Sequence, residues 1–155
     1  MYPVGERIVG SRKCKSANCK TCYNIREDNQ FTSSSNGKTF KINHELNCNS
    51  KNVFYLLKCK VCEKQYVGQT TNPFRFRWNN YKSVHTKAAK GENVPQMSFH
   101  QHFLGADHHG LEKDVEITLI DHTSAFSPTQ RENFWMFSLN TISPSGFNMM
   151  EEGVS

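Results

Sequence analysis

Six cysteines occur at spacings that are typical of metal ligands. The stretch "CKSANCKTC" supplies three thiols within nine residues, and a fourth ligand could come from Cys48, with His44 as its substitute. A Cys-x-x-Cys turn lets two thiolates converge on one tetrahedral ion. We therefore predict a structural zinc site. Its four ligands are Cys14, Cys19, Cys22 and Cys48.

A second Cys-x-x-Cys turn, "CKVC", supplies Cys59 and Cys62 but needs two more ligands. The histidine-rich stretch "HQHFLGADHHG" is the obvious donor, and neutral imidazole is a common zinc ligand. We predict a second zinc site that also uses His102 and either His108 or His109. The chain should then carry two zinc ions.

Disulfides and buried free thiols are the alternatives to zinc. An even number of cysteines suggests disulfides in a secreted chain, but "MYPVGERIVG" has no apolar signal-peptide core. No apolar run approaches the length of a membrane span. We expect an intracellular chain that does not enter a membrane and that could be one domain of a longer protein.

The charge is unevenly distributed. Residues 1–64 hold twelve Lys and Arg against five Asp and Glu, which gives +7, and residues 65–155 hold seven against nine, which gives −2. A basic segment favours a polyanionic partner such as nucleic acid. A solvated lysine surface is the simpler alternative.

The hydrophobic pattern changes near residue 52. Residues 1–50 show little periodicity and include the loop-like "NQFTSSSNGKTF", so we expect a metal to hold this segment. We divide the chain into a basic zinc-binding segment, 1–51, and a second domain, 52–155, with the second zinc site inserted in it.

The segments "VFYLLKC" and "QYVGQ" read as two strands. A hairpin centred on "CKVC" would place Cys59 opposite Cys62 and, in the same register, Tyr55 opposite Tyr66. Directly opposed residues project from the same face of a sheet. The metal turn would thus bring two phenols together.

Two helices and a third strand are expected after the hairpin. In the first helix Asn72 is a suitable N-cap, Pro73 suits the first helical position and Gly91 suits the stop. Arg77 falls within its inward stripe, where it needs an anion or a carboxylate. The stretch "VEITLID" at 115–121 alternates as a strand.

The second helix is predicted from "SPTQRENFWMFSLNT". Ser127 is its cap, Pro128 its first residue, and Gln130 completes a capping box. Glu132 shares a face with Trp135, and a carboxylate on an apolar face must be paired or bound to a metal. It could be catalytic, or it could form a structural ion pair with an arginine.

In order and spacing, these elements resemble the GIY-YIG endonuclease superfamily over roughly residues 52–149. "VFY" stands at the first motif, "YVG" at the second, "RENFW" carries the acidic residue and "GFN" the asparagine. The Cys-x-x-Cys between the motifs, with the downstream "HF…HH", is similar to the branch carried by Penelope-like retroelements. In that branch the nuclease follows a reverse transcriptase.

The resemblance implies an α+β fold in which a small antiparallel sheet is flanked by helices, here with an N-terminal zinc-stabilised segment. It implies hydrolysis of a DNA phosphodiester. The candidate catalytic residues by position are Tyr55, Tyr66, Arg77, His85, Glu132 and Asn148. Val53 stands where the first motif has glycine, and Tyr81 stands where some members have a histidine.

The roles follow from the resemblance and from the chemistry of a phosphate anion. Tyr55 or Tyr66 would help to activate water, because a phenol in an electropositive pocket could lose its proton more readily. Arg77 would stabilise charge on the phosphate. Glu132 would hold one magnesium or manganese ion.

Asn148 would help to order the site, and His85 would assist from the same helix face as the arginine. We expect a nuclear nickase that leaves a 3′-hydroxyl to prime reverse transcription, with RNA and a fused reverse transcriptase as further partners. One alternative is a zinc-stabilised nucleic-acid-binding module that does not cut. Another is a zinc-dependent adaptor of the ubiquitin-ligase kind.

Overall fold

A three-stranded antiparallel sheet forms the centre of the molecule. In the computed structural model, residues 9–91, 102–103, 110–122 and 128–148 are described. The central strand β5 (Val53–Cys59) pairs with β6 (Gln65–Thr70) on one side and with β7 (Val115–His122) on the other. Six of the seven residues of β5 are buried, as expected for a strand that is covered on both faces. Its unbroken apolar run follows from that position.

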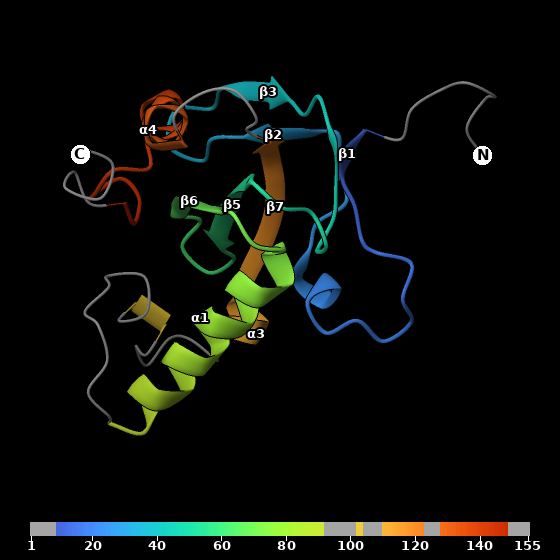
Figure 1. The fold of residues 1–155 in the computed structure, drawn as a ribbon. Helices are drawn as coiled ribbons and strands as arrows, with labels where there is room; N and C mark the ends of the chain where they lie inside the picture. The colour runs from blue at the N-terminus through green and yellow to red at the C-terminus, as the bar shows by residue number, and fades with distance from the viewer. Residues whose placement is uncertain (1–8, 92–101, 104–109, 123–127, 149–155) are drawn as a thin grey trace.

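Each face of the sheet is covered by different elements (Figure 1). Helix α1 (Phe74–Ala89) packs on the face that carries Tyr55. The other face is covered by the hairpin of β2 (Gln30–Thr32) and β3 (Thr39–Lys41) and by helix α4 (Pro128–Leu139). The predicted α+β class, with a small antiparallel sheet flanked by helices, is confirmed.

The amino-terminal segment lies along the outer edge of β7. It contains β1 (Gly10–Ser11) paired with β4 (Glu45–Leu46), and the short 3-10 helix η1 (Cys22–Asn24). The backbone N–H of Arg26 donates to the carbonyl of Ile117 at 2.7 Å. This contact satisfies a backbone group that an edge strand would otherwise expose.

The predicted register of the hairpin is wrong by two residues. Tyr55 pairs with Gly68, not with Tyr66, and Cys59 stands opposite Lys64, not opposite Cys62. The loop is wider than a two-residue turn, because residues 60–64 lie outside the strands and Glu63 adopts a φ of 68°. A shift of two preserves the face, so Tyr66 stays a diagonal neighbour of Tyr55.

The helix ends are close to their predicted positions. Pro73 is the N-cap residue of α1 and not its first helical residue. The helix ends at Ala89, with Lys90 as the C-cap residue before Gly91, whose φ is 78°. Helix α4 begins at Pro128 as predicted, whereas Ser127 lies outside the described residues. The short helix α3 (Leu111–Asp114) precedes β7. None of the helices in the described residues is long and apolar enough to span a membrane.

Candidate active site and metal centres

Three phenols meet between the sheet and α1. The hydroxyl of Tyr55 lies 2.7 Å from that of Tyr81, and the Tyr81 hydroxyl also interacts with that of Tyr66. The Tyr55 ring packs against Phe74, with ring centroids 4.9 Å apart. Only 1% of Tyr55 and 5% of Tyr81 is exposed, compared with 9% of Tyr66. The two motif tyrosines are therefore brought together, but through a third tyrosine.

Gly68 makes room for this arrangement. A Cβ atom at Gly68 would overlap the phenol ring and hydroxyl of Tyr55, the residue that pairs with it across the strands. The Tyr55 side chain therefore lies across β6 where a larger residue would displace it. The second motif "YVG" thus has a steric reason for its glycine in this chain.

Arg77 and Glu132 act on the same phenol group. Burial raises the pKa of Tyr81 above its ordinary value of 10, the bond from Tyr55 and the charge of Arg77 oppose the rise, and the Glu132 carboxylate adds to it. The guanidinium from α1 and the carboxylate from α4 therefore lie within electrostatic range of one hydroxyl. The sequence places Arg77 in the inward stripe of α1, but its side chain is exposed. An exposed guanidinium is accessible to a phosphate.

The pKa of Tyr55 shifts in the direction opposite to the one expected for a phenol in an electropositive pocket. Burial raises its pKa well above 10, Tyr81 and Tyr66 raise it further, and the charge of Arg77 only partly opposes the increase. Desolvation disfavours a charged phenolate more than one cation favours it. Tyr55 is therefore a neutral hydrogen-bonding group at neutral pH.

Asn148 holds the outer edge of β6. Its side-chain amide accepts a hydrogen bond from the Val67 N–H at 2.8 Å and donates one to the Val67 carbonyl at 2.9 Å. Its Oδ1 atom also accepts from the Thr141 hydroxyl at 2.8 Å. An amide replaces a neighbouring strand at this residue, because it carries both a donor and an acceptor. Asn148 thereby fixes the strand residue next to Tyr66.

His85 lies further along α1, beside Lys82 and Leu111 at the edge of an open hollow. Eight residues separate it from Arg77, which is about 12 Å of helix rise. Burial lowers its pKa below 6.5. Arg77 and Glu132 lie near the phenols, and His85 lies about two turns further along α1. A role in catalysis stays a prediction for this residue.

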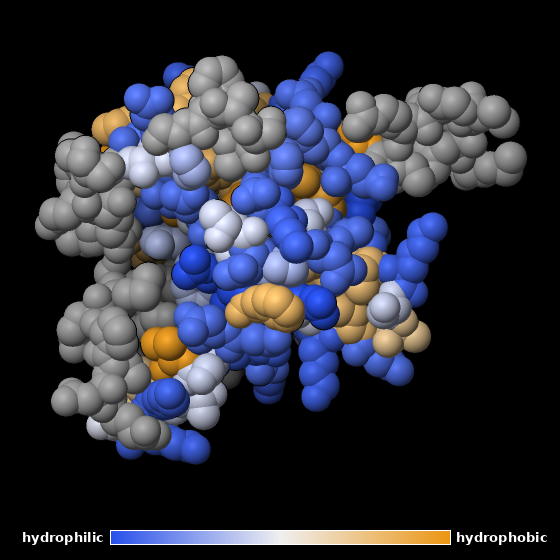
Figure 2. All heavy atoms as spheres, in the orientation of Figure 1, coloured by the Kyte–Doolittle hydropathy of each residue, from blue (hydrophilic) through white to orange (hydrophobic). Residues whose placement is uncertain are grey.

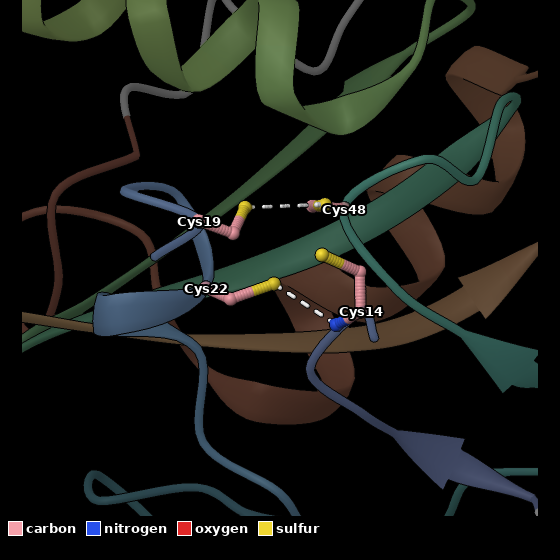
Figure 3. A group of neighbouring side chains, drawn as sticks. All are labelled: Cys14, Cys19, Cys22 and Cys48. Carbon is pink, nitrogen blue, oxygen red and sulfur yellow. Dashed lines mark hydrogen bonds between the residues drawn. The ribbon is translucent and has the colours of Figure 1, made fainter. Parts of the chain in front are cut away.

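The four predicted cysteine ligands of the first site converge (Figure 3), and they are called here the four-cysteine cluster. Cys14 follows β1, Cys19 and Cys22 lie at η1, and Cys48 follows β4, with all ligand atoms within 4.8 Å of one another. The sulfurs of Cys19 and Cys48 are 3.8 Å apart. Four sulfurs at about 2.3 Å from one tetrahedral zinc are themselves about 3.8 Å apart. These thiols therefore fit a zinc ion, and no disulfide joins them.

The surroundings of these thiols favour a bound cation. Burial raises the pKa of Cys22 to about 11 and raises that of Cys48 well above its ordinary value, whereas a backbone hydrogen bond from Ser16 lowers the pKa of Cys14 to about 7. The Cys14 N–H also donates to the Cys22 sulfur at 3.0 Å. Four crowded sulfurs of this kind must share protons or bind a metal.

His44 is not part of the four-cysteine cluster. Its Nε2 atom lies 3.7 Å from the buried carboxylate of Asp121, and its ring stands beside that of His122. Asp121 also accepts hydrogen bonds from Arg131 at 2.6 Å and from the Trp135 indole at 2.9 Å. The arginine that precedes Glu132 is thereby tied to β7, which fixes the first turn of α4.

The second metal group contains three of the four predicted ligands. The Nε2 atom of His102 lies 3.3 Å from the Cys62 sulfur and 3.4 Å from the Cys59 sulfur, and the three can hold a metal ion together. His108 and His109 lie outside the described residues. The wide loop between β5 and β6 is what turns both sulfurs toward the imidazole.

Tyr81 is the site residue that the sequence analysis did not select. It lies one helical turn after Arg77, and its burial at i+3 from Trp78 reads as ordinary core packing. The signal that could have identified it is its position: a polar-tipped side chain one turn from a catalytic arginine, on the face toward the two strand tyrosines.

The profile of the GIY-YIG catalytic domain matches residues 51–141. This range includes the paired strands, Arg77 and Glu132, and it covers more than half of the chain. The chain therefore belongs to the GIY-YIG catalytic domain family, whose members are endonucleases. No curated protein and no solved structure matches the chain.

Proposed function

We propose that this chain is a divalent-metal-dependent DNA endonuclease that nicks one strand and leaves a 3′-hydroxyl. The observation that carries the proposal is the buried pair of Tyr55 and Tyr81 hydroxyls, 2.7 Å apart. Arg77 on α1 and Glu132 on α4 lie within electrostatic range of this pair. A phosphodiester reaction needs positive charge at the phosphate and a carboxylate to hold a cation. Family membership supplies the reaction class.

Each residue then has a defined task. The exposed guanidinium of Arg77 binds the scissile phosphate, because its planar fork matches phosphate oxygens. Glu132 holds magnesium or manganese, since a single carboxylate together with substrate phosphates is a common way to bind such ions. The bound ion would neutralise charge on the phosphate. Asn148 keeps β6, and with it Tyr66, in place.

Tyr66 is the better candidate for activating water. It is the most exposed of the three phenols, at 9%, whereas Tyr55 is buried and its pKa is raised well above 10. A general base must reach the water whose proton it takes. Tyr55 then has a positioning role, because its hydrogen bond to Tyr81 orients the Tyr81 hydroxyl.

The biological setting of the proposal is a retroelement of the Penelope-like kind. Cys59 and Cys62 lie between the first and second motifs, and His102 follows the second motif. This order resembles that of the Penelope-like branch. The 3′-hydroxyl would prime reverse transcription by a fused polymerase that uses an RNA template. Such an enzyme would act on chromosomal DNA in the nucleus.

The test is nicking of supercoiled plasmid by zinc-loaded protein with added magnesium or manganese. Relaxed circles should form with the metal and not without it, and a polymerase should extend the nicks directly. Tyr66→Phe should slow nicking about 100-fold or more, and Tyr55→Phe should slow it less. Intact plasmid under all metal conditions would refute the enzyme, and nicks that need end repair before extension would refute the priming role.

A second candidate function is a zinc-stabilised nucleic-acid-binding module that positions a larger enzyme. The charge of +7 on residues 1–64 favours it, as does the four-cysteine cluster in the proposed 1–51 segment. A module of this kind would bind nucleic acid with a steep salt dependence. Glu132→Ala would leave this binding unchanged, and the protein would show no metal-dependent nicking. Both functions can coexist in one chain.

A further inference from the structure

Tyr23 is exposed to an unusual degree for an aromatic residue. Its side chain is 80% exposed, whereas the other exposed large hydrophobic residues that the structure describes range from 46% to 58%. Exposed apolar side chains need no explanation when they are scattered singly. Tyr23 differs because of how it is held and what surrounds it.

Both neighbours of Tyr23 are anchored. Cys22 is 4% exposed and belongs to the four-cysteine cluster. The Asn24 side chain donates to the carbonyls of Glu112 and Val115, both at 2.8 Å. The two anchors fix the backbone of η1, so the exposed tyrosine is carried on a rigid support. A rigid ring loses little conformational entropy when a ligand binds.

Two hollows share Tyr23 and Asn24, and together they are lined by six basic and three acidic side chains. These basic side chains come from segments far apart in the sequence: Lys13, Lys20, Arg26, Lys60, Lys82 and Lys113. The three glutamates are Glu27, Glu112 and Glu116, of which Glu116 is paired with Arg26 at 3.6 Å, so the lining keeps a formal net charge of +3. The surface around the ring is therefore complementary to a polyanion.

We propose that Tyr23 and these basic residues, called here the Tyr23 surface, bind single-stranded nucleic acid. The ring stacks on one unpaired base, and the lysines contact the flanking phosphates. The interior of a duplex offers no such base face, because its bases are stacked on one another. Figure 2 shows mainly hydrophilic residues on the visible face over α1 and the sheet, with hydrophobic ones in scattered patches.

The Tyr23 surface uses no residue of the phenol site, so it can be tested independently of cutting. Zinc-loaded protein without added magnesium is titrated into fluorescent 12-nucleotide oligomers of thymidine or uridine, and binding is read by anisotropy. Tyr23→Ala should weaken binding about 5-fold or more, and Tyr23→Phe should retain it. Phe137→Ala, an exposed aromatic on α4, is the matched control and should bind normally.

Salt dependence tests the phosphate contacts. Lys20→Gln and Lys113→Gln should each reduce the slope of log K against log salt by about 0.7. Zinc content and circular dichroism of each variant exclude misfolding as the cause of a loss.

Three results would overturn the proposal. Tyr23→Ala could bind as tightly as the wild type, or Tyr23→Phe could lose as much affinity as Tyr23→Ala. The third is an equal loss for a blunt duplex of the same length, since stacking on an unpaired base would then not be the contact. Each result is independent of plasmid nicking, so it leaves the proposed nuclease untouched.

Discussion

The ring of Tyr55 lies across Gly68, its partner on the neighbouring strand. A methyl group at Gly68 would occupy the position of the phenol, so Gly68→Ala must displace Tyr55 and break its contact with Tyr81. We expect a loss of about 1–3 kcal/mol in the free energy of unfolding, as for other overpacked cores, together with a large loss of nicking. Urea denaturation and the plasmid assay measure the two effects.

Gln69→Ala is the matched control for this change, because Gln69 is the next residue of β6 and projects from the other face of the sheet. It should leave both quantities close to those of the wild type. Wild-type nicking by Gly68→Ala would show that the position of the Tyr55 ring does not matter.

The buried phenols should resist ionisation. Because burial raises the pKa of Tyr55 and Tyr81 above 10, both stay protonated in the folded chain when exposed tyrosines lose their protons. The stability that the two neutral phenols contribute is complete below pH 10, which is the pKa of tyrosine in the unfolded chain. It is lost as the pH rises above 10 toward the raised pKa values of the folded chain. Absorbance at alkaline pH should show at least two tyrosines that ionise late, and Tyr55→Phe should remove one of them. Simultaneous ionisation of all tyrosines in folded protein would contradict the buried network.

Zinc content should be two ions per chain. Elemental analysis of Cys48→Ser should give one, because it removes a ligand of the four-cysteine cluster, and His102→Ala should also give one, through the other group. His44→Ala should still give two, since His44 lies beside Asp121 instead. One ion lost on His44→Ala, with none lost on Cys48→Ser, would mean that the ligands are assigned wrongly.

Asn148 should be needed for both its donor and its acceptor. Asn148→Asp keeps an acceptor for the Val67 N–H but cannot donate to the Val67 carbonyl, and a buried carbonyl left without a donor costs about 1–3 kcal/mol. We expect that loss in the free energy of unfolding, and a larger one for Asn148→Ala. Equal stability of Asn148→Asp and the wild type would remove the proposed support of β6.

The sequence predicts which side chains belong to a site better than it predicts how the strands that carry them are paired. The four-cysteine cluster is recovered because each ligand is a rare residue type at a chemically constrained spacing. The hairpin register is missed because loop width depends on how Cys59, Cys62 and a distant histidine meet, which no local pattern contains. The meeting of Arg77 and Glu132 follows from their helix faces only when the family order is known.

Tyr81 is a site residue that the sequence pattern alone does not identify. A buried tyrosine between Trp78 and the helix end is indistinguishable from core packing until the opposite strands are placed. The Tyr23 surface could not be predicted either, because its lysines come from the amino-terminal segment, the hairpin, α1 and α3. Only the folded chain brings these charges together.

The most direct test of the catalytic site is the single-turnover nicking rate of Glu132→Gln beside that of Arg77→Ala. Glu45→Gln, which alters an exposed carboxylate on β4, is the control and should nick at the wild-type rate. With two zinc ions and a normal fold retained, each site variant should be at least about 100-fold slower than the wild type. Wild-type nicking by Glu132→Gln would contradict the assignment of this carboxylate to the metal and phosphate site.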